Sequence, residues 1–292
     1  MFEPLQYEFF VRGLIAATVV GALCGLIGVY VVLRRMSYIG HGLSHAIFGG
    51  AVVSFVMGFN FYIGASLWGF GSALLINWTT RQRKFIAADA AIGIITTASF
   101  ALGIALISRY RTFTRSFDAA LFGNILGVDQ NDLYAIIGVT ILTFAVVIVM
   151  YRRFLFTTFD PEVAPYFGVS TAWIDTLFSL ILAGAIVVSL QVLGATLIAS
   201  ALVIPPITAR LLTDNFGRMM ILSVVIGAAC GFVGIYASYY VDIASGASIV
   251  LVSAGAFVLA MAYSGIRNRL ATARGLTPAG APVGTQEHAA IE

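Results

Sequence analysis

Long apolar stretches separated by short polar connections run along nearly the whole chain. A helix needs roughly 20 apolar residues to cross the hydrocarbon core of a bilayer, and unbroken runs of that length favour helices over membrane β-strands, whose pattern alternates. About nine segments fit, and the pattern therefore predicts an all-α, polytopic membrane protein with about 8–9 transmembrane helices. These segments are 8–33, 39–58, 61–79, 86–108, 131–151, 172–189, 193–212, 218–240 and 246–267, the weakest being 61–79 and 172–189.

Composition agrees with this pattern. Apolar residues make up 60% of the 292 residues and charged residues 10%, against about 45–50% and about 25% in soluble domains. The net charge of +3 is small and the basic residues are scattered, so the chain lacks the clustered basic surface of a nucleic-acid-binding protein. The N-terminus has no basic n-region or cleavage site, and we expect the first span to remain in the mature protein.

The last residues differ from the rest. Residues 268–292 are rich in Ala, Gly, Pro and Thr without apolar periodicity, which predicts a disordered tail after a transmembrane domain of residues 1–267. Cys24 and Cys230 each lie within an apolar run, and we interpret both as small packing residues because no disulfide or zinc spacing is present.

Basic residues follow every second span, which sets the orientation. By the positive-inside rule the N-terminus is outside and the C-terminus inside, with the tail cytoplasmic. The connection 108–128 is then external, yet it holds Arg109, Arg111 and Arg115. Either the span count is off by one, or these arginines have an external partner such as an acidic patch on a soluble binding protein.

Small residues recur at four-residue spacing in two spans. Gly21 and Gly25 lie in the first, and Gly227 and Gly231 lie in the eighth. Such spacing lets helices approach closely. An internal repeat, as found in many transporters, is the alternative.

Two histidines are the strongest candidates for chemistry. No nucleotide-binding P-loop, H-E-x-x-H or G-x-S-x-G motif occurs, so the polar groups within spans are what remains. His41 and His45 are four residues apart and share a helical face. Ten residues beyond Arg35, at about 1.5 Å each, place His45 about 15 Å deep, roughly the bilayer midplane. Either they coordinate a metal ion transiently, or one bonds a backbone carbonyl while the other packs.

Other polar positions have two interpretations each. Asp89 opens the fourth span, where it complements the helix dipole or lies on an ion path. Pro205 and Pro206 should break a span, either as a gating element or as a simple kink. Asp160, followed by Pro161 and Glu162, fits the start of a short cytoplasmic helix. We interpret that segment as a contact for an energy-supplying partner, the alternative being a plain surface loop.

The chain as a whole resembles the membrane permeases of ABC importers for manganese, zinc and iron(II). The resemblance covers roughly residues 8–267 and depends on the order and spacing of several segments. They are "VVLRRMSYIGHGLSHAIFGG" (31–50), "DAAIGIITTASFALGIALIS" (89–108), "LFGNILGV" (121–128), "FDPEVAPYFGV" (159–169), "LQVLGATLIASALVIPPITARLL" (190–212) and "SYYVDIASGASIVLV" (238–252).

The resemblance implies a type II-like ABC importer permease in the bacterial plasma membrane. It implies a homodimer, surrounded by lipid, with cytoplasmic ATPase subunits that bind ATP and an extracytoplasmic metal-binding protein. The segment 159–169, with Asp160 and Glu162, would lead into the ATPase contact, and 109–128 would lie outside. The permease itself would be no enzyme and hold no cofactor, the divalent transition metal being its substrate.

One position departs from the family. Members usually read G-D-x-x-S-H-A, and both the Asp and the His are implicated in handling the ion. Here His45 matches directly, whereas His41 stands where the Asp is expected. Replacing a carboxylate by an imidazole should lessen the preference for Mn²⁺ and favour Zn²⁺ or Fe²⁺.

Three functions follow in decreasing order of support. The first is an ATP-driven importer subunit that passes a divalent metal across His41 and His45. The second is a proton-coupled secondary metal carrier with the same histidines as a proton relay. The third is an intramembrane metalloenzyme, which lacks a general base beside the paired histidines.

Overall fold

The computed structural model describes residues 3–82, 88–110 and 121–273, and all of the regular elements in these ranges are helices. The all-α prediction is therefore confirmed. The long helices are α1 (Glu8–Leu33), α2 (Ser37–Val56), α3 (Phe61–Gln82), α4 (Ala88–Tyr110), α6 (Gln130–Val149), α7 (Tyr151–Phe159), α8 (Thr171–Leu212), α9 (Phe216–Val241) and α10 (Ser245–Ala273). Three short 3-10 helices are η1 (Glu3–Gln6), η2 (Ile125–Gly127) and η3 (Ala164–Phe167).

Seven of the described helices are long and apolar enough to cross a membrane. The weak candidate α3 is not among them, but its contacts show that it extends between the two ends of the bundle. The Tyr62 hydroxyl donates to Asp132 at the start of α6, and the Asn77 amide donates to Thr176 at the start of α8. Fifteen helical residues separate Tyr62 from Asn77, or roughly 22 Å. Helix α3 therefore extends along the bundle beside the others.

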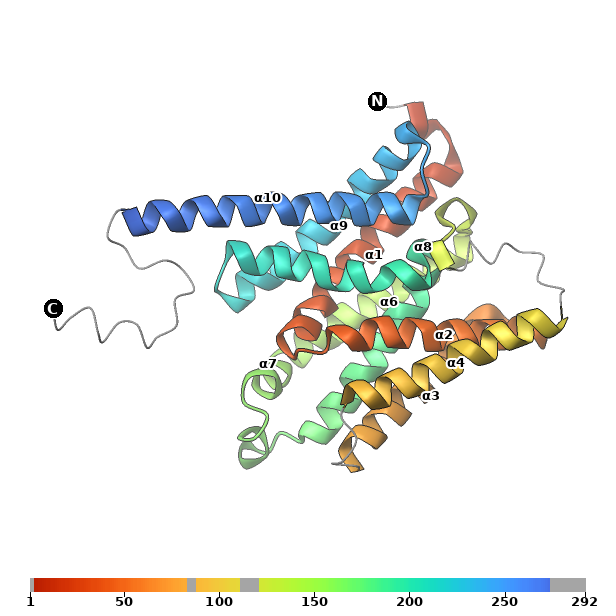
Figure 1. The fold of residues 1–292 in the computed structure, drawn as a ribbon, viewed down its shortest axis with the longest axis horizontal. Helices are drawn as coiled ribbons and strands as arrows, with labels where there is room; N and C mark the ends of the chain where they lie inside the picture. The colour runs from red at the N-terminus through yellow and green to blue at the C-terminus, as the bar shows by residue number, and fades with distance from the viewer. Residues whose placement is uncertain (1–2, 83–87, 111–120, 274–292) are drawn as a thin grey trace.

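Helix α8 contains two predicted spans in one element of 42 residues. Its backbone leaves helical geometry at Gly194, with φ 74° and ψ 162°, and the two halves of α8 run in different directions (Figure 1). A Cβ at Gly194 would overlap backbone atoms of Gly123 and Leu121. Both the left-handed φ and the close approach therefore require glycine at this position.

The predicted break at Pro205 and Pro206 is wrong, since the helix continues through both prolines. A proline at position 206 leaves the carbonyl of Leu202 without its usual backbone donor. That carbonyl faces Gly28 of α1 so closely that a Cβ on Gly28 would overlap it. Contact of the carbonyl with the glycine Cα–H is one way the bundle accommodates the lost hydrogen bond.

Helix α1 is largely buried and packs against both α8 and α9. Gly21 and Gly227 lie in direct backbone contact. One turn away, the Ser223 hydroxyl donates to the carbonyl of Gly25 at 2.7 Å. The predicted close approach of the two glycine-bearing spans is thus confirmed. We refer to this contact as the α1–α9 seam.

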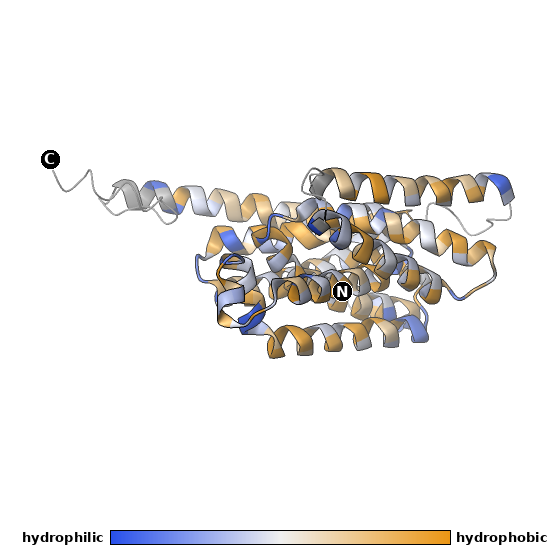
Figure 2. Ribbon diagram, turned by 90° about the horizontal axis from the view of Figure 1, so that it is seen from below, coloured by the Kyte–Doolittle hydropathy of each residue, from blue (hydrophilic) through white to orange (hydrophobic). Residues whose placement is uncertain are grey.

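Helix α2 lies among α3, α4 and α8 (Figure 1). Most hydrophilic residues lie towards the helix ends, and apolar residues cover the length of the helices (Figure 2). Cys24 and Cys230 are both buried and unpaired by disulfide, as expected of packing residues.

At the C-terminal end, α10 continues to Ala273. Residues 268–273 are therefore helical and belong to this element, not to an unstructured tail. The remainder of the predicted tail, 274–292, lies outside the described residues.

Candidate functional site

The paired histidines of α2 face each other. The ring centroids of His41 and His45 are 4.5 Å apart, with the ring planes at 88°. Both side chains are half-buried. Phe100 of α4 covers His45, with its ring centroid 4.7 Å from the imidazole. The predicted stacking of the two imidazoles on one helical face is confirmed.

Glycines bring α4 close enough to form this arrangement. Gly49 lies against the carbonyl of Ser99, and a Cβ on Gly103 would lie 3.0 Å from the Cα of Gly49. A Cβ on Gly42 would come within 2.6 Å of Ile92. Larger residues at these positions would separate the helices and remove Phe100 from His45. We refer to this contact as the α2–α4 seam.

Ser44, beside His45, ties α2 to the turn of α8. Its hydroxyl oxygen lies 2.7 Å from the carbonyl oxygen of Ala195 and 2.8 Å from that of His41. Ala195 directly follows Gly194, so the bend of α8 is held against the helix that bears both histidines. The segment 121–128 completes this region, because Thr196 donates to the carbonyl of Leu121 at 2.7 Å.

His45 has a ring nitrogen that is free for another ligand. Its Nδ1 atom is buried and has no hydrogen-bond partner. A buried imidazole nitrogen without a partner is unfavourable unless something else binds it. Within the described ranges, no group of three or more His, Cys, Asp and Glu side chains could enclose a metal ion. The two imidazoles therefore offer a loose, two-ligand site of the kind that suits an ion in transit.

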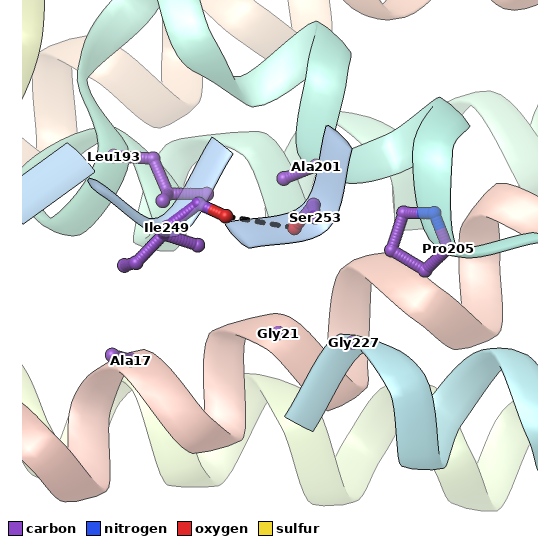
Figure 3. A pocket seen from close by; sticks show the side chains of 8 residues that line it. All are labelled: Ala17, Gly21, Leu193, Ala201, Pro205, Gly227, Ile249 and Ser253. Atoms are coloured by element: carbon purple, nitrogen blue, oxygen red, sulfur yellow. Dashed lines mark hydrogen bonds between the residues drawn. The ribbon is translucent and has the colours of Figure 1, made fainter. Parts of the chain in front are cut away.

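The other predicted path residues lie apart from this pair. Asp89 falls in the first turn of α4, but its side chain lies outside the described residues. Pro205 lines a narrow space between α1, α8, α9 and α10. Its volume is about 10 Å³, which is room for one water molecule at most. Figure 3 shows this space, lined by Ala17, Gly21, Leu193, Ala201, Pro205, Gly227, Ile249 and Ser253. A gating role for the prolines stays a prediction.

The predicted partner segment is exposed but folds differently from expectation. Asp160 does not begin a helix; it ends α7, and its carbonyl accepts hydrogen bonds from the backbone N–H groups of Val163 and Ala164. The short helix η3 starts only at Ala164, after a turn that includes Pro161 and Glu162. Beyond the two acids, Tyr166 and Phe167 project outward, with 89% and 72% of their surface exposed.

Of the three arginines predicted to be external, the structure describes one. Arg109 lies exposed in the last turn of α4. Arg111 and Arg115 lie outside the described residues, so their arrangement as a docking surface stays a prediction.

Two polar networks were not anticipated from the sequence. At one end, Asp175 of α8 pairs with both Arg34 and Arg81, at 2.8 and 2.9 Å. The pairing joins the start of α8 to the end of α1 and to the last turn of α3.

At the other end, the buried carboxylate of Asp132 accepts hydrogen bonds from Tyr62, Gln191 and the backbone of Asp129. Together with Asp129, the same carboxylate forms the capping box at the start of α6. Asp132 thus joins α3, α6 and α8 at the end of the bundle opposite Asp175.

Comparison with known proteins gives a consistent result. A model described as the ABC 3 transport family matches residues 6–264. The manganese transport system membrane protein MntC of Halalkalibacterium halodurans is 38% identical over 262 residues, covering 90% of this chain and 89% of the relative. A probable iron transport system membrane protein of Haemophilus influenzae is 33% identical over 269 residues, covering 92% and 98%.

Solved structures agree. The structure of PsaBC from Streptococcus pneumoniae in complex with Fab superimposes with a TM-score of 0.80 at 33% identity, covering 88% of this chain and 92% of that one. An inward-facing structure of a putative metal-chelate type ABC transporter shares the fold, with a TM-score of 0.74 at 17% identity and 90% coverage of each chain.

Proposed function

This chain belongs to the ABC 3 transport family, and we propose that it imports a divalent transition metal across the bacterial plasma membrane, with His41 and His45 as the ion's transient ligands. As a member of the family it is a multi-pass permease subunit of an ABC transporter, and ATP hydrolysis belongs to a separate subunit. The relatives are named for manganese or iron transport, which supports Mn²⁺ or Fe²⁺ as candidate substrates.

The observation that carries the proposal is the geometry of the histidine pair. The imidazoles stand 4.5 Å apart, and Nδ1 of His45 is buried without a partner. An ion held by two imidazoles binds weakly enough to leave again, as transport requires. In a homodimer the second copy would bring the same residues, and ligands from both copies could meet at one ion.

Two surfaces would connect the permease to its partners. We call residues 159–169 the docking segment and propose that it contacts the ATPase. Its exposed aromatic side chains, Tyr166 and Phe167, are typical of residues that become buried in a protein interface. Asp160 and Glu162 precede them in the same segment. At the opposite end, Arg109, with Arg111 and Arg115, would meet carboxylates of an extracytoplasmic binding protein.

The test is reconstitution. Permease, ATPase and binding protein from the same organism are placed in proteoliposomes, and uptake of Mn²⁺, Fe²⁺ and Zn²⁺ is measured with and without ATP. We expect uptake to require both ATP and the ATPase, and to disappear when His41 and His45 are both replaced by Ala. The matched control is His288→Ala, which removes an imidazole from the C-terminal tail.

The outcomes separate the alternatives. Uptake driven by a proton gradient without any ATPase would identify the secondary carrier instead. Normal ATP-dependent uptake by the double histidine variant would keep the importer but remove the site.

The identity of the metal depends on His41. We expect wild-type protein to favour Fe²⁺ or Zn²⁺ over Mn²⁺ more strongly than the His41→Asp variant, because an imidazole is a softer ligand than a carboxylate. Competition uptake with pairs of metals measures this directly. An unchanged order of preference in His41→Asp would show that position 41 does not set selectivity.

A further inference from the structure

Arg34 joins separate elements at the predicted cytoplasmic end of the bundle. Its guanidinium donates to Asp175 Oδ1 of α8 at 2.8 Å, to Thr157 Oγ1 at 2.8 Å and to Thr158 Oγ1 at 3.1 Å, the last two from α7. It also stands 4.8 Å above the ring of Phe178. Only 7% of the arginine side chain is exposed. These partners hold the buried guanidinium in one orientation, because its planar fork of donors matches their geometry.

The carboxylate of Asp175 extends the network to a third helix. Its second oxygen lies 2.9 Å from Nη2 of Arg81, in the last turn of α3. Helix α3 packs against α2. Asp175 therefore holds two cations in place, and without it the two guanidinium groups would face each other unneutralised.

The turn after Arg34 leads directly into the histidine-bearing helix. Arg35 adopts a left-handed conformation with φ 57°, and the Met36 N–H donates to the carbonyl of Val31 at 2.9 Å. Helix α2 begins at the next residue, Ser37. A turn this short and internally bonded passes a displacement of Arg34 to the start of α2, one turn before His41.

On its other side, the network reaches the docking segment. Helix α7, which bears both threonines, ends at Phe159, where the docking segment begins. A cavity of about 290 Å³ lies alongside, and its walls include Met36 at the start of α2 and Pro161 in the docking segment. The cavity leaves room for the polar groups to shift. Elsewhere α7 packs mainly on α6 and α8, and one aromatic contact, Tyr30 with Phe154, joins it to α1.

We propose that Arg34 is a positioning residue that conveys movement of the docking segment to α2 and its histidines. Thr157 and Thr158 transmit the movement to the guanidinium, and Asp175 anchors it. The inference rests on the proposed function, because it presupposes an ATPase on the docking segment and an ion at the histidines.

The experiment measures coupling, not activity alone. The full complex is reconstituted in proteoliposomes, and the number of metal ions imported per ATP hydrolysed is determined. Arg34→Lys keeps the charge but cannot form the same fork of bonds. We expect this ratio to fall about tenfold, while the rate of ATP hydrolysis stays within about twofold of wild type, since the ATPase contact itself is unchanged.

Paired variants isolate the hydroxyl groups. Replacing Thr157 and Thr158 together by Val keeps their shape and removes both acceptors, so the ratio should fall as in Arg34→Lys. Replacing both by Ser keeps the acceptors and should restore it. Arg153→Lys in the same helix is the matched control, because Arg153 is exposed and its guanidinium contacts only the Met150 sulfur among the described groups, at 3.8 Å.

The double variant Arg34→Lys with Asp175→Asn tests whether the two residues act as a unit. If they do, its import-to-hydrolysis ratio should be no lower than that of the more impaired single variant. An unchanged import-to-hydrolysis ratio in Arg34→Lys overturns the inference. The inference is also overturned if the ratio falls only in variants whose complex no longer elutes as a single species in size-exclusion chromatography. A wild-type complex without ATP-dependent uptake contradicts the proposed function itself.

Discussion

The α1–α9 seam and the α2–α4 seam both depend on glycine, but they serve different purposes. In both, glycines bring two helix backbones into contact, Gly21 with Gly227 in one and Gly49 with Gly103 in the other. Beside the glycines of the α1–α9 seam, the described segments 17–25 and 223–231 contain no His, Asp, Glu, Lys or Arg. The α2–α4 seam keeps two imidazoles beside the contact and covers one with Phe100.

The difference separates packing from function. Close approach needs only small residues, and it stabilises a bundle in lipid without polar groups. Imidazoles within a span are unfavourable unless they have a partner or a task. Changes in the α1–α9 seam should therefore damage the fold, and changes at the histidines should damage transport while the fold persists.

The largest effect is expected from Gly21→Val. The added side chain would overlap the backbone of Gly227, and neither backbone can move without separating α1 from α9. We expect a loss of about 3 kcal/mol of stability, at the upper end of what overpacking usually costs. Thermal unfolding in detergent and the yield of monodisperse protein measure it. Folded protein at wild-type yield would show that the seam tolerates separation.

Next comes His45→Ala, which removes one proposed ligand. Loss of a group that merely supports a metal ligand typically costs 10–100-fold, so loss of the ligand itself should reduce uptake by about 100-fold. The unfolding temperature should stay near that of wild type, because the imidazole is half-buried and its Nδ1 atom makes no hydrogen bond. If the variant unfolds instead, the contrast between the two seams is lost.

Ser44→Ala should have an intermediate effect. It removes the hydroxyl shared by Ala195 and His41, and a buried hydrogen bond contributes about 1 kcal/mol. The α8 turn should then open more easily, which hydrogen exchange at residues 194–196 would detect as lower protection. Ser44→Thr would keep the hydroxyl but add a methyl group to a fully buried position. Ser44→Cys is therefore the better control, because it keeps a similar side-chain size and only weakens the hydrogen-bond donor.

The smallest effect is expected from Gly93→Ala. Gly93 lies in α4, yet a Cβ there meets no atom within 4 Å. Alanine favours a helix over glycine by up to about 1 kcal/mol, so stability should stay equal or rise slightly. Thermal unfolding measures the change. A clear loss of stability would mean that this face of α4 is buried against another chain.

The sequence predicts the spans well because the bilayer imposes their length and composition. Predicted and observed bounds agree closely for 8–33 and α1 or for 218–240 and α9. The helix break predicted at Pro205 and Pro206 is wrong because proline breaks a helix only where nothing accommodates the freed carbonyls. Here Gly28 of another helix faces one of those carbonyls. The boundary between the predicted spans 172–189 and 193–212 lies next to the turn at Gly194, but the left-handed geometry of that glycine has no signal in the sequence.

The candidate site divides in the same way. The histidine pair is local, four residues apart, so its geometry follows from helix periodicity. The bond between Arg34 and Asp175 joins positions 141 residues apart, and no local pattern signals such a partner. The cap expected at Asp160 failed for a related reason, since α7 continues up to that residue and makes it a helix end instead of a start.

The two buried cysteines have a practical consequence. Cys24 is 1% exposed and Cys230 is 5% exposed, so the native chain should react slowly with a membrane-impermeant maleimide. A single cysteine introduced at Arg109 or at Tyr166, both exposed, would then dominate the labelling. Comparing intact cells with opened membranes would assign each position to a compartment, and so establish the orientation of the permease without removing either native cysteine.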